Sequence, residues 1–92
     1  MEPLKITIFQ AYLFWENVDK NLQNLGLRLS SLREKTDLII IPEMFNTGFT
    51  MNVEICAETM NGKTMHWLFE TSKKFGCVIA GSLIIEENSK YY

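Results

Sequence analysis

A run of branched apolar residues that stops at a proline places the strongest constraint on how this chain folds. Residues 38–41 are one leucine and three isoleucines, and Pro42 and Glu43 follow directly. Such a run is typical of a strand that is buried on both faces, as in a parallel sheet. Proline has no N–H to donate to a sheet ladder, so Pro42 marks the end of the strand. The sequence therefore predicts that Glu43 lies at the carboxyl edge of a buried strand.

This position makes Glu43 a candidate for proton transfer. In open α/β sheets, ligands bind at the carboxyl ends of the strands. A carboxylic acid that is partly desolvated at such an edge is suited to exchange protons with a substrate. The same pattern also fits a solvated loop acid that follows a strand. Spacing alone leaves both interpretations open.

The first half of the chain alternates between strand and helix patterns. Residues 4–10 alternate apolar and polar side chains, which predicts a first strand. Between residues 16 and 35 the period lengthens, and one stripe of an amphipathic helix is formed by Val18, Leu22, Leu25, Leu29 and Leu32. Gly26 interrupts this helix, which hints at close packing there. With the strand at 37–41 these segments form a βαβ unit, which implies parallel strands and a right-handed crossover.

The second half continues the alternation. Residues 44–61 are predicted to be irregular, and loops of this kind often carry binding residues. Residues 63–75 predict a second helix that Gly76 caps. Residues 77–85 predict a third strand, and residues 88–89 predict a turn into a returning strand. The expected fold class is therefore α/β, with the order β-α-β-α-β and the start of a fourth strand.

Composition argues against several classes of function. Of the 92 residues, 47% are hydrophobic and 22% are charged, which is typical of one small globular domain or a piece of a larger one. A formal net charge of -2 without a basic cluster gives no reason to expect nucleic acid as a partner. The N-terminus has no signal-peptide pattern, and no apolar run approaches the roughly 20 residues that span a bilayer. We therefore expect a cytoplasmic protein with no membrane partner.

Metal and disulfide chemistry have little support in the sequence. Cys56 and Cys77 are too few and too isolated for a disulfide framework or a paired-cysteine metal site. His66 is the single histidine, and no spacing supplies it with carboxylate partners. We therefore expect no metal. Core packing is expected for Cys77 at the start of a strand, and a bystander role for Cys56 in the long loop.

Several short motifs, taken together, resemble the nitrilase (carbon–nitrogen hydrolase) superfamily. They are Phe9-Gln10, Trp15, Asn21-Leu22, the strand that ends in Pro42-Glu43, and Gly81-Ser82. The string from Pro42 to Asn52 is similar to the ω-amidase-like branch. The resemblance extends over all 92 residues, in order. It implies that residues 1–92 are the N-terminal portion of a single domain, an α-β-β-α sandwich in which two sheets face each other between helix layers.

The resemblance also implies a catalytic set of a glutamate, a lysine and a cysteine. The glutamate carries over to Glu43, whereas the lysine and the cysteine belong to family motifs beyond Tyr92. Neither Cys77 nor Lys90 matches those motifs. The implied reaction is hydrolysis of small linear amides with release of ammonia, without a cofactor, in a homo-oligomer that is commonly a dimer. Because two catalytic groups are missing, we expect the 92-residue chain alone to be inactive.

Two other interpretations are weighed beside this one. A stand-alone, non-catalytic module could self-associate through the sheet face that a second sheet would otherwise cover. A flavodoxin-like or receiver-like domain shares the βαβ pattern, but the chain lacks a phosphate-binding glycine loop after the first strand and a cluster of acids at the strand ends. Phe45 and Phe49 flank Glu43 and fit either a substrate pocket or the core.

Overall fold

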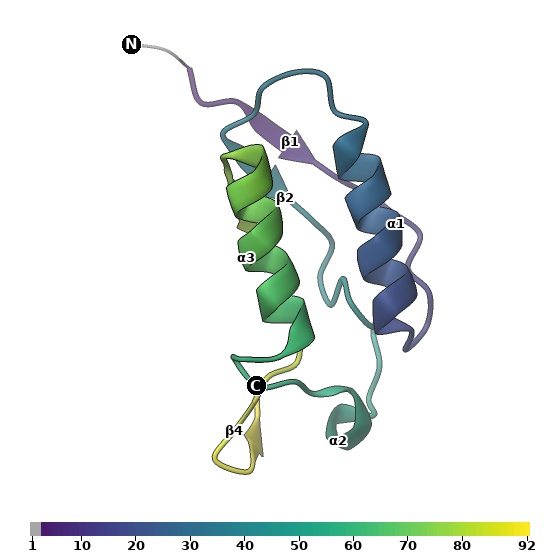
Figure 1. Cartoon of the computed structure of the whole chain (residues 1–92). Helices are drawn as coiled ribbons and strands as arrows, with labels where there is room; N and C mark the ends of the chain where they lie inside the picture. Colours follow the sequence, from purple (N-terminus) through teal and green to yellow (C-terminus); the bar gives the residue numbers. More distant parts are fainter. Residues whose placement is uncertain (1–2) are drawn as a thin grey trace.

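The computed structural model describes residues 3–92, which form a three-stranded parallel sheet with helices packed on it (Figure 1). The strands are β1 (Ile6–Ile8), β2 (Leu38–Ile40) and β3 (Val78–Ala80), in that order across the sheet. β2 is central and pairs in parallel with both neighbours. The predicted α/β class and parallel topology are confirmed. Residues 1–2, part of the domain predicted over 1–92, lie outside the described residues.

Two helices cover one face of this sheet. α1 (Val18–Ser30) and α3 (Lys63–Phe75) lie side by side in Figure 1, and they contact each other. The core between helices and sheet is formed by the buried side chains of Leu22, Leu25, Leu29, Ile39, Ile41, Phe45 and Cys77. The leucine stripe predicted for the first helix is therefore its buried face.

The opposite face of the sheet is open. The register places these apolar side chains on it: Ile6, Ile8, Leu38, Ile40, Val78 and Ala80. We call them the open sheet face. Ile6, Ile8 and Val78 are 51%, 68% and 63% exposed, so no part of residues 3–92 covers them. β2 is therefore buried on one face only, which corrects the expectation that both faces are buried.

Serine and asparagine side chains set the ends of α1, which is shorter than the predicted range 16–35. The helix begins after Asn17, whose side-chain oxygen accepts a hydrogen bond from the Lys20 N–H at 3.1 Å. It ends where the hydroxyls of Ser30 and Ser31 donate to helix carbonyls at 2.9 and 2.6 Å. Such hydroxyls compete with the helix ladder for backbone groups.

α3 has the bounds that the sequence predicts, and Gly76 caps it at a φ of 61°. Glycine adopts this left-handed conformation without a steric penalty, so the predicted cap is confirmed. Among residues 3–92, neither α1 nor any other helix combines the length and the apolar character needed to cross a membrane.

The segment 44–61 differs from its prediction because it contains a short helix, α2 (Val53–Cys56). A single helical turn is too short to leave a periodic pattern in the sequence. Cys56 therefore lies at the end of a helix, where it is buried, and not in an irregular loop.

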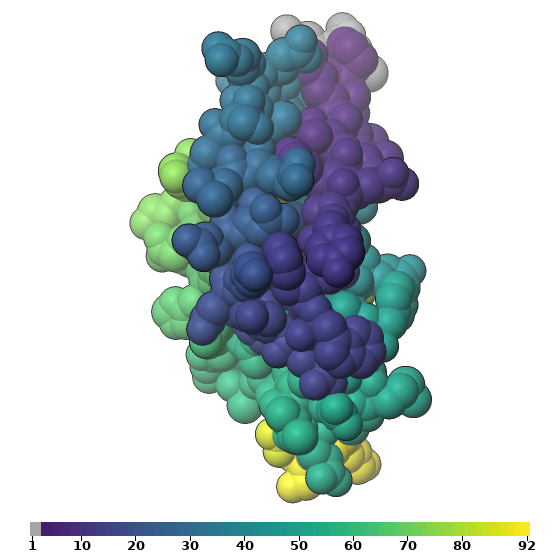
Figure 2. Space-filling model, turned by 90° about the vertical axis from the view of Figure 1, so that its right-hand side faces the viewer, coloured from purple at the N-terminus to yellow at the C-terminus, as the bar shows by residue number. Residues whose placement is uncertain are grey.

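A hairpin follows the sheet at one end of the molecule (Figure 2). β3 stops at Ala80, not at residue 85, because the chain leaves the sheet at Gly81. β4 (Glu86–Glu87) then pairs in antiparallel with β5 (Lys90–Tyr91). The two turn residues, 88 and 89, both have positive φ, at 53° and 64°. This conformation is the one that two-residue hairpins favour, so the predicted turn is confirmed.

Candidate active site

Glu43 lies just beyond the carboxyl end of the central strand, as the sequence predicts. The Ile41 N–H donates to the Ala80 carbonyl at 2.9 Å, so the ladder runs one residue past β2 before Pro42 ends it. Residues 43–47 then form a run of turns, which we call the β2 turn. The Glu43 side chain is exposed. Of the two interpretations that the sequence leaves open, a solvated acid after the strand fits the residues that the structure describes.

The segment after β3 holds the β2 turn from one side. Ser82 Oγ accepts a hydrogen bond from the Met44 N–H at 2.9 Å, and the Ser82 carbonyl accepts one from the Phe45 N–H at 3.3 Å. Gly81 permits this approach, since a Cβ there would lie 2.7 Å from Ile41 Cγ1 and 3.0 Å from Phe45 Cδ1. Gly81, one of the motif residues on which the family resemblance rests, therefore lies where a side chain would not fit. Phe45 is a core residue, fully buried beneath the turn.

Asn21 holds the β2 turn from the helix side. Its side chain is buried, and its Nδ2 donates to the carbonyls of Phe14 and Asn46, both at 2.8 Å. Its Oδ1 accepts a hydrogen bond from the Phe14 N–H at 2.7 Å. One side chain thus joins the connector before α1 to the loop that carries Glu43. The signal for this role is a polar residue on the leucine face of an amphipathic helix.

A second polar cluster lies beneath the same loop. Asn46 is fully buried, and its Nδ2 donates to Glu58 Oε2 at 3.2 Å and to Thr64 Oγ1 at 3.1 Å. Glu58 Oε1 accepts a hydrogen bond from the Thr64 N–H at 2.7 Å, near the start of α3. The Asn46 Oδ1 has no hydrogen-bond partner among residues 3–92. No local spacing in the sequence joins these three residues, so sequence reasoning missed Glu58 and Thr64.

Glu16 forms hydrogen bonds with the end of this loop through its backbone and its side chain. Its N–H donates to the Thr47 carbonyl at 2.7 Å, and its backbone has a φ of 52°. Its carboxylate accepts hydrogen bonds from the Thr50 hydroxyl and from Asn52 Nδ2, the latter at 2.7 Å. These two hydrogen bonds, the one from Thr50 first, lower the pKa of Glu16 below its ordinary value of 4.5, against a smaller opposing effect of desolvation.

The hydrogen bonds of the Glu16 carboxylate should make the stability of the fold depend on pH in the acid range. A carboxyl group with a lowered folded-state pKa stabilises the fold above its unfolded pKa, and this contribution is lost as pH falls through the folded pKa. We therefore expect Glu16→Gln to have a lower melting temperature than the wild type near pH 6, and the gap to shrink toward about pH 3. Glu34→Gln, at an exposed acid, is the control. A gap that does not change with pH would contradict this assignment.

Cys77 lies at the opposite edge of the sheet from Glu43, whereas Cys56 lies at the end of α2. Cys77 precedes β3 at the amino edge, where the Val78 N–H donates to the Asp37 carbonyl at 3.0 Å. Burial, with a smaller contribution from the charge of Asp37, raises the pKa of the Cys77 thiol. Cys77 belongs to the buried core, so its predicted core role is confirmed, and the raised pKa disfavours a reactive thiolate. Cys56 and Cys77 are both free thiols.

The other sequence candidates lie on the surface. Lys90 is exposed in the hairpin, and His66 is exposed on α3. Phe49, one of the two aromatics that flank Glu43, is 67% exposed. Within residues 3–92, no group of three or more histidine, cysteine, aspartate or glutamate side chains could hold a metal ion.

Comparison with known proteins shows which family this chain belongs to. The family described as carbon-nitrogen hydrolase matches residues 5–92. This chain belongs to the carbon–nitrogen hydrolase family. It is 36% identical over 87 residues to omega-amidase YafV of Yersinia enterocolitica, and 31% identical over 90 residues to omega-amidase YafV of Escherichia coli. These alignments cover 92% and 97% of the chain.

A solved structure supports the same fold for this carbon–nitrogen hydrolase chain. XC1258 of Xanthomonas campestris, described as a CN-hydrolase superfamily protein with an arsenic adduct in its active site, matches with a TM-score of 0.93 and 29% identity. The match covers 100% of the chain and 35% of XC1258. The chain likewise spans only 32% and 34% of the two omega-amidases. The predicted nitrilase-type α/β fold is confirmed.

Proposed function

We propose that this chain supplies the catalytic glutamate, Glu43, of an amidohydrolase that cleaves the carbon–nitrogen bond of small linear amides. The observation that carries the proposal is the position of Glu43, on a turn beyond the central strand. The segment after β3, α1 and Glu16 hold this turn from three sides. The names of the omega-amidase relatives favour small ω-amides as the substrate class.

In this proposal Glu43 works with a cysteine and a lysine, as in the catalytic set of the family. A thiol with an ordinary pKa of about 8.5 needs a base to attack an amide at neutral pH. Glu43 takes the thiol proton as the sulfur attacks the carbonyl, and then gives it to the nitrogen, which leaves as ammonia. Glu43 next takes a proton from the water that attacks the thioester, and returns it to the departing thiol. The lysine stabilises the oxyanion of each tetrahedral intermediate.

Amide hydrolysis should require more than the 92-residue chain. Cys77 lies at the amino edge of the sheet, and neither Cys56 nor Cys77 matches the nucleophile motif of the family, so the isolated chain should release no ammonia from an ω-amide. A chimera in which the chain replaces its matching third of the Escherichia coli omega-amidase should release ammonia. A coupled ammonia assay measures both. Hydrolysis by the isolated chain that Cys77→Ala abolishes would contradict the proposal, as would a folded but inactive chimera.

The open sheet face favours a second candidate function, a non-catalytic module that self-associates. Its six side chains are all apolar, and three of them are more than half exposed. Apolar patches of this kind mark interaction surfaces in monomeric proteins. A second copy of the chain that packs the same face against it would remove both patches from water. The family resemblance implies dimers as well, although by an unspecified surface.

The dimer should depend on the apolar character of this face. We expect the 92-residue chain to elute as a defined dimer in size-exclusion chromatography with light scattering, and Ile8→Lys to convert it to a monomer, because the dimer would bury an unpaired charge. Leu27→Lys is the matched control, since Leu27 is 67% exposed but lies on α1. A monomeric wild type would count against the module and leave the amidase proposal unaffected.

A further inference from the structure

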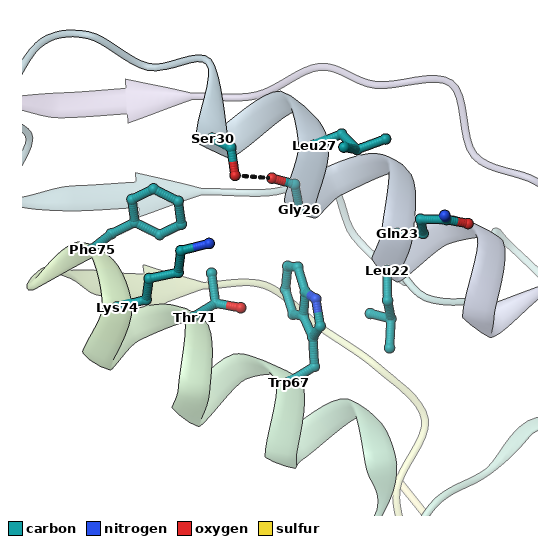
Figure 3. A pocket seen from close by; sticks show the side chains of 9 residues that line it. All are labelled: Leu22, Gln23, Gly26, Leu27, Ser30, Trp67, Thr71, Lys74 and Phe75. Atoms are coloured by element: carbon teal, nitrogen blue, oxygen red, sulfur yellow. Dashed lines mark hydrogen bonds between the residues drawn. The ribbon is translucent and has the colours of Figure 1, made fainter.

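A groove runs between α1 and α3 (Figure 3). Its volume is about 340 Å³, which lies within the range of small-molecule sites. The side chains of Leu22, Trp67 and Phe75 give it apolar walls (Figure 3). The groove belongs to the helix layer, whereas Glu43 lies beyond the end of a strand, so it is separate from the candidate active site.

Gly26 leaves space in this groove beside the indole of Trp67. A Cβ at Gly26 would lie 3.9 Å from Trp67 Nε1, an ordinary contact distance, so the helices are less tightly packed there than the sequence suggests. Figure 3 shows a side-chain hydrogen bond within this lining, from the Ser30 hydroxyl to the Gly26 carbonyl. The indole N–H, which can only donate, has no acceptor among the residues that line the groove.

The polar groups of the groove are complementary to an anion. Trp67, Thr71 and Lys74 extend from α3 toward α1 in Figure 3. The Lys74 ammonium lies 5.6 Å from the Phe75 ring centroid, and the ion pair found among residues 3–92 involves a different lysine. No aspartate or glutamate lines the groove. An ammonium, an indole N–H and a hydroxyl beside apolar walls suit a ligand that has a carboxylate on an apolar body.

We propose that this groove binds a small aromatic carboxylate. The ring of the ligand packs against the Trp67 indole and Leu22, because offset or edge contacts between aromatic rings are favourable. The carboxylate accepts hydrogen bonds from the Trp67 N–H and from the Lys74 ammonium. The proposal uses no step of the amide hydrolysis, so either proposal can fail without the other.

Benzoate is the probe, and the two indole N–H signals of the ¹⁵N-labelled 92-residue chain are the readout. The Trp67 signal should shift saturably, with a dissociation constant of about 1 mM for so open a groove. The Trp15 signal is an internal control and should stay in place, because Trp15 lies against Gly48, outside the groove. Benzamide lacks the charge and acetate lacks the ring, so each should bind at least about fivefold more weakly.

A pair of lysine variants tests where the carboxylate lies. Lys74→Met should weaken benzoate binding by about fivefold or more. Lys73→Met, at the exposed neighbour that does not line the groove, should leave the affinity for benzoate unchanged. Equal binding of benzamide, a parallel shift of Trp15, or unchanged affinity in Lys74→Met would overturn the proposal. A shift of the Trp67 indole signal when the protein concentration is raised without benzoate would also overturn the proposal, since a second copy would then occupy the groove.

Discussion

Replacing Glu43 by glutamine should lower the kcat of amide hydrolysis by about 10²- to 10⁴-fold, the range typical of a lost general acid–base group. Glutamine has nearly the same size but can neither take the thiol proton nor return it to the leaving nitrogen. Because the proposed mechanism uses Glu43 before and after the thioester, both its formation and its hydrolysis should slow. The measurement is ammonia release by the chimera with the Escherichia coli omega-amidase, with and without the substitution.

The loss should concern chemistry and not folding. The Glu43 side chain is exposed, so the free energy of unfolding should change by no more than about 0.5 kcal/mol. Glu54→Gln, at an exposed acid on the neighbouring α2, is the matched control and should keep full activity. A Glu43→Gln chimera with kcat close to that of its parent would show that another group carries the proton.

The regular elements could be predicted because each leaves a local pattern. The branched run before Pro42 predicted the central strand. The spacing of residues 63–75, with Gly76 after them, predicted both ends of α3 correctly. Short-range periodicity and cap chemistry are enough for such elements. The one-turn helix α2 leaves no period, which is why it was missed.

The contacts that hold the β2 turn could not be predicted from local pattern. Asn21 and Asn46 are 25 positions apart, and Ser82 is 38 positions from Met44. Such pairs meet only after the strands align and the helices pack on one face. The family resemblance marked Asn21 and Ser82 without saying what they do. In the structure both hold the turn that carries Glu43.

One failed expectation has a plain physical cause. The sequence predicted burial of β2 on both faces, which requires material packed against the open sheet face. Residues 3–92 supply helices to the other face only. Branched apolar residues such as Leu38 and Ile40 predict an apolar environment, but they do not say which chain provides it.

Asn21→Ala should destabilise the fold by about 2–4 kcal/mol, because it removes a buried side chain that donates and accepts hydrogen bonds. Three hydrogen bonds are lost, and the Phe14 N–H, the Phe14 carbonyl and the Asn46 carbonyl each lose a partner. Alanine favours helix more than asparagine by about 0.5 kcal/mol, so this gain offsets only a small part of the loss. Urea unfolding of the 92-residue chain measures the difference.

Asn24→Ala is the control that separates the loss of the Asn21 hydrogen bonds from the gain in helix propensity. Asn24 lies one turn further along α1 and takes no part in the contacts of Asn21, so this variant gains the same helix propensity without the loss. The difference between the two variants therefore isolates what the Asn21 side chain contributes by tying the connector at Phe14 to the loop at Asn46. Equal stability of the two would mean that these groups find other partners, and that the β2 turn keeps its shape without Asn21.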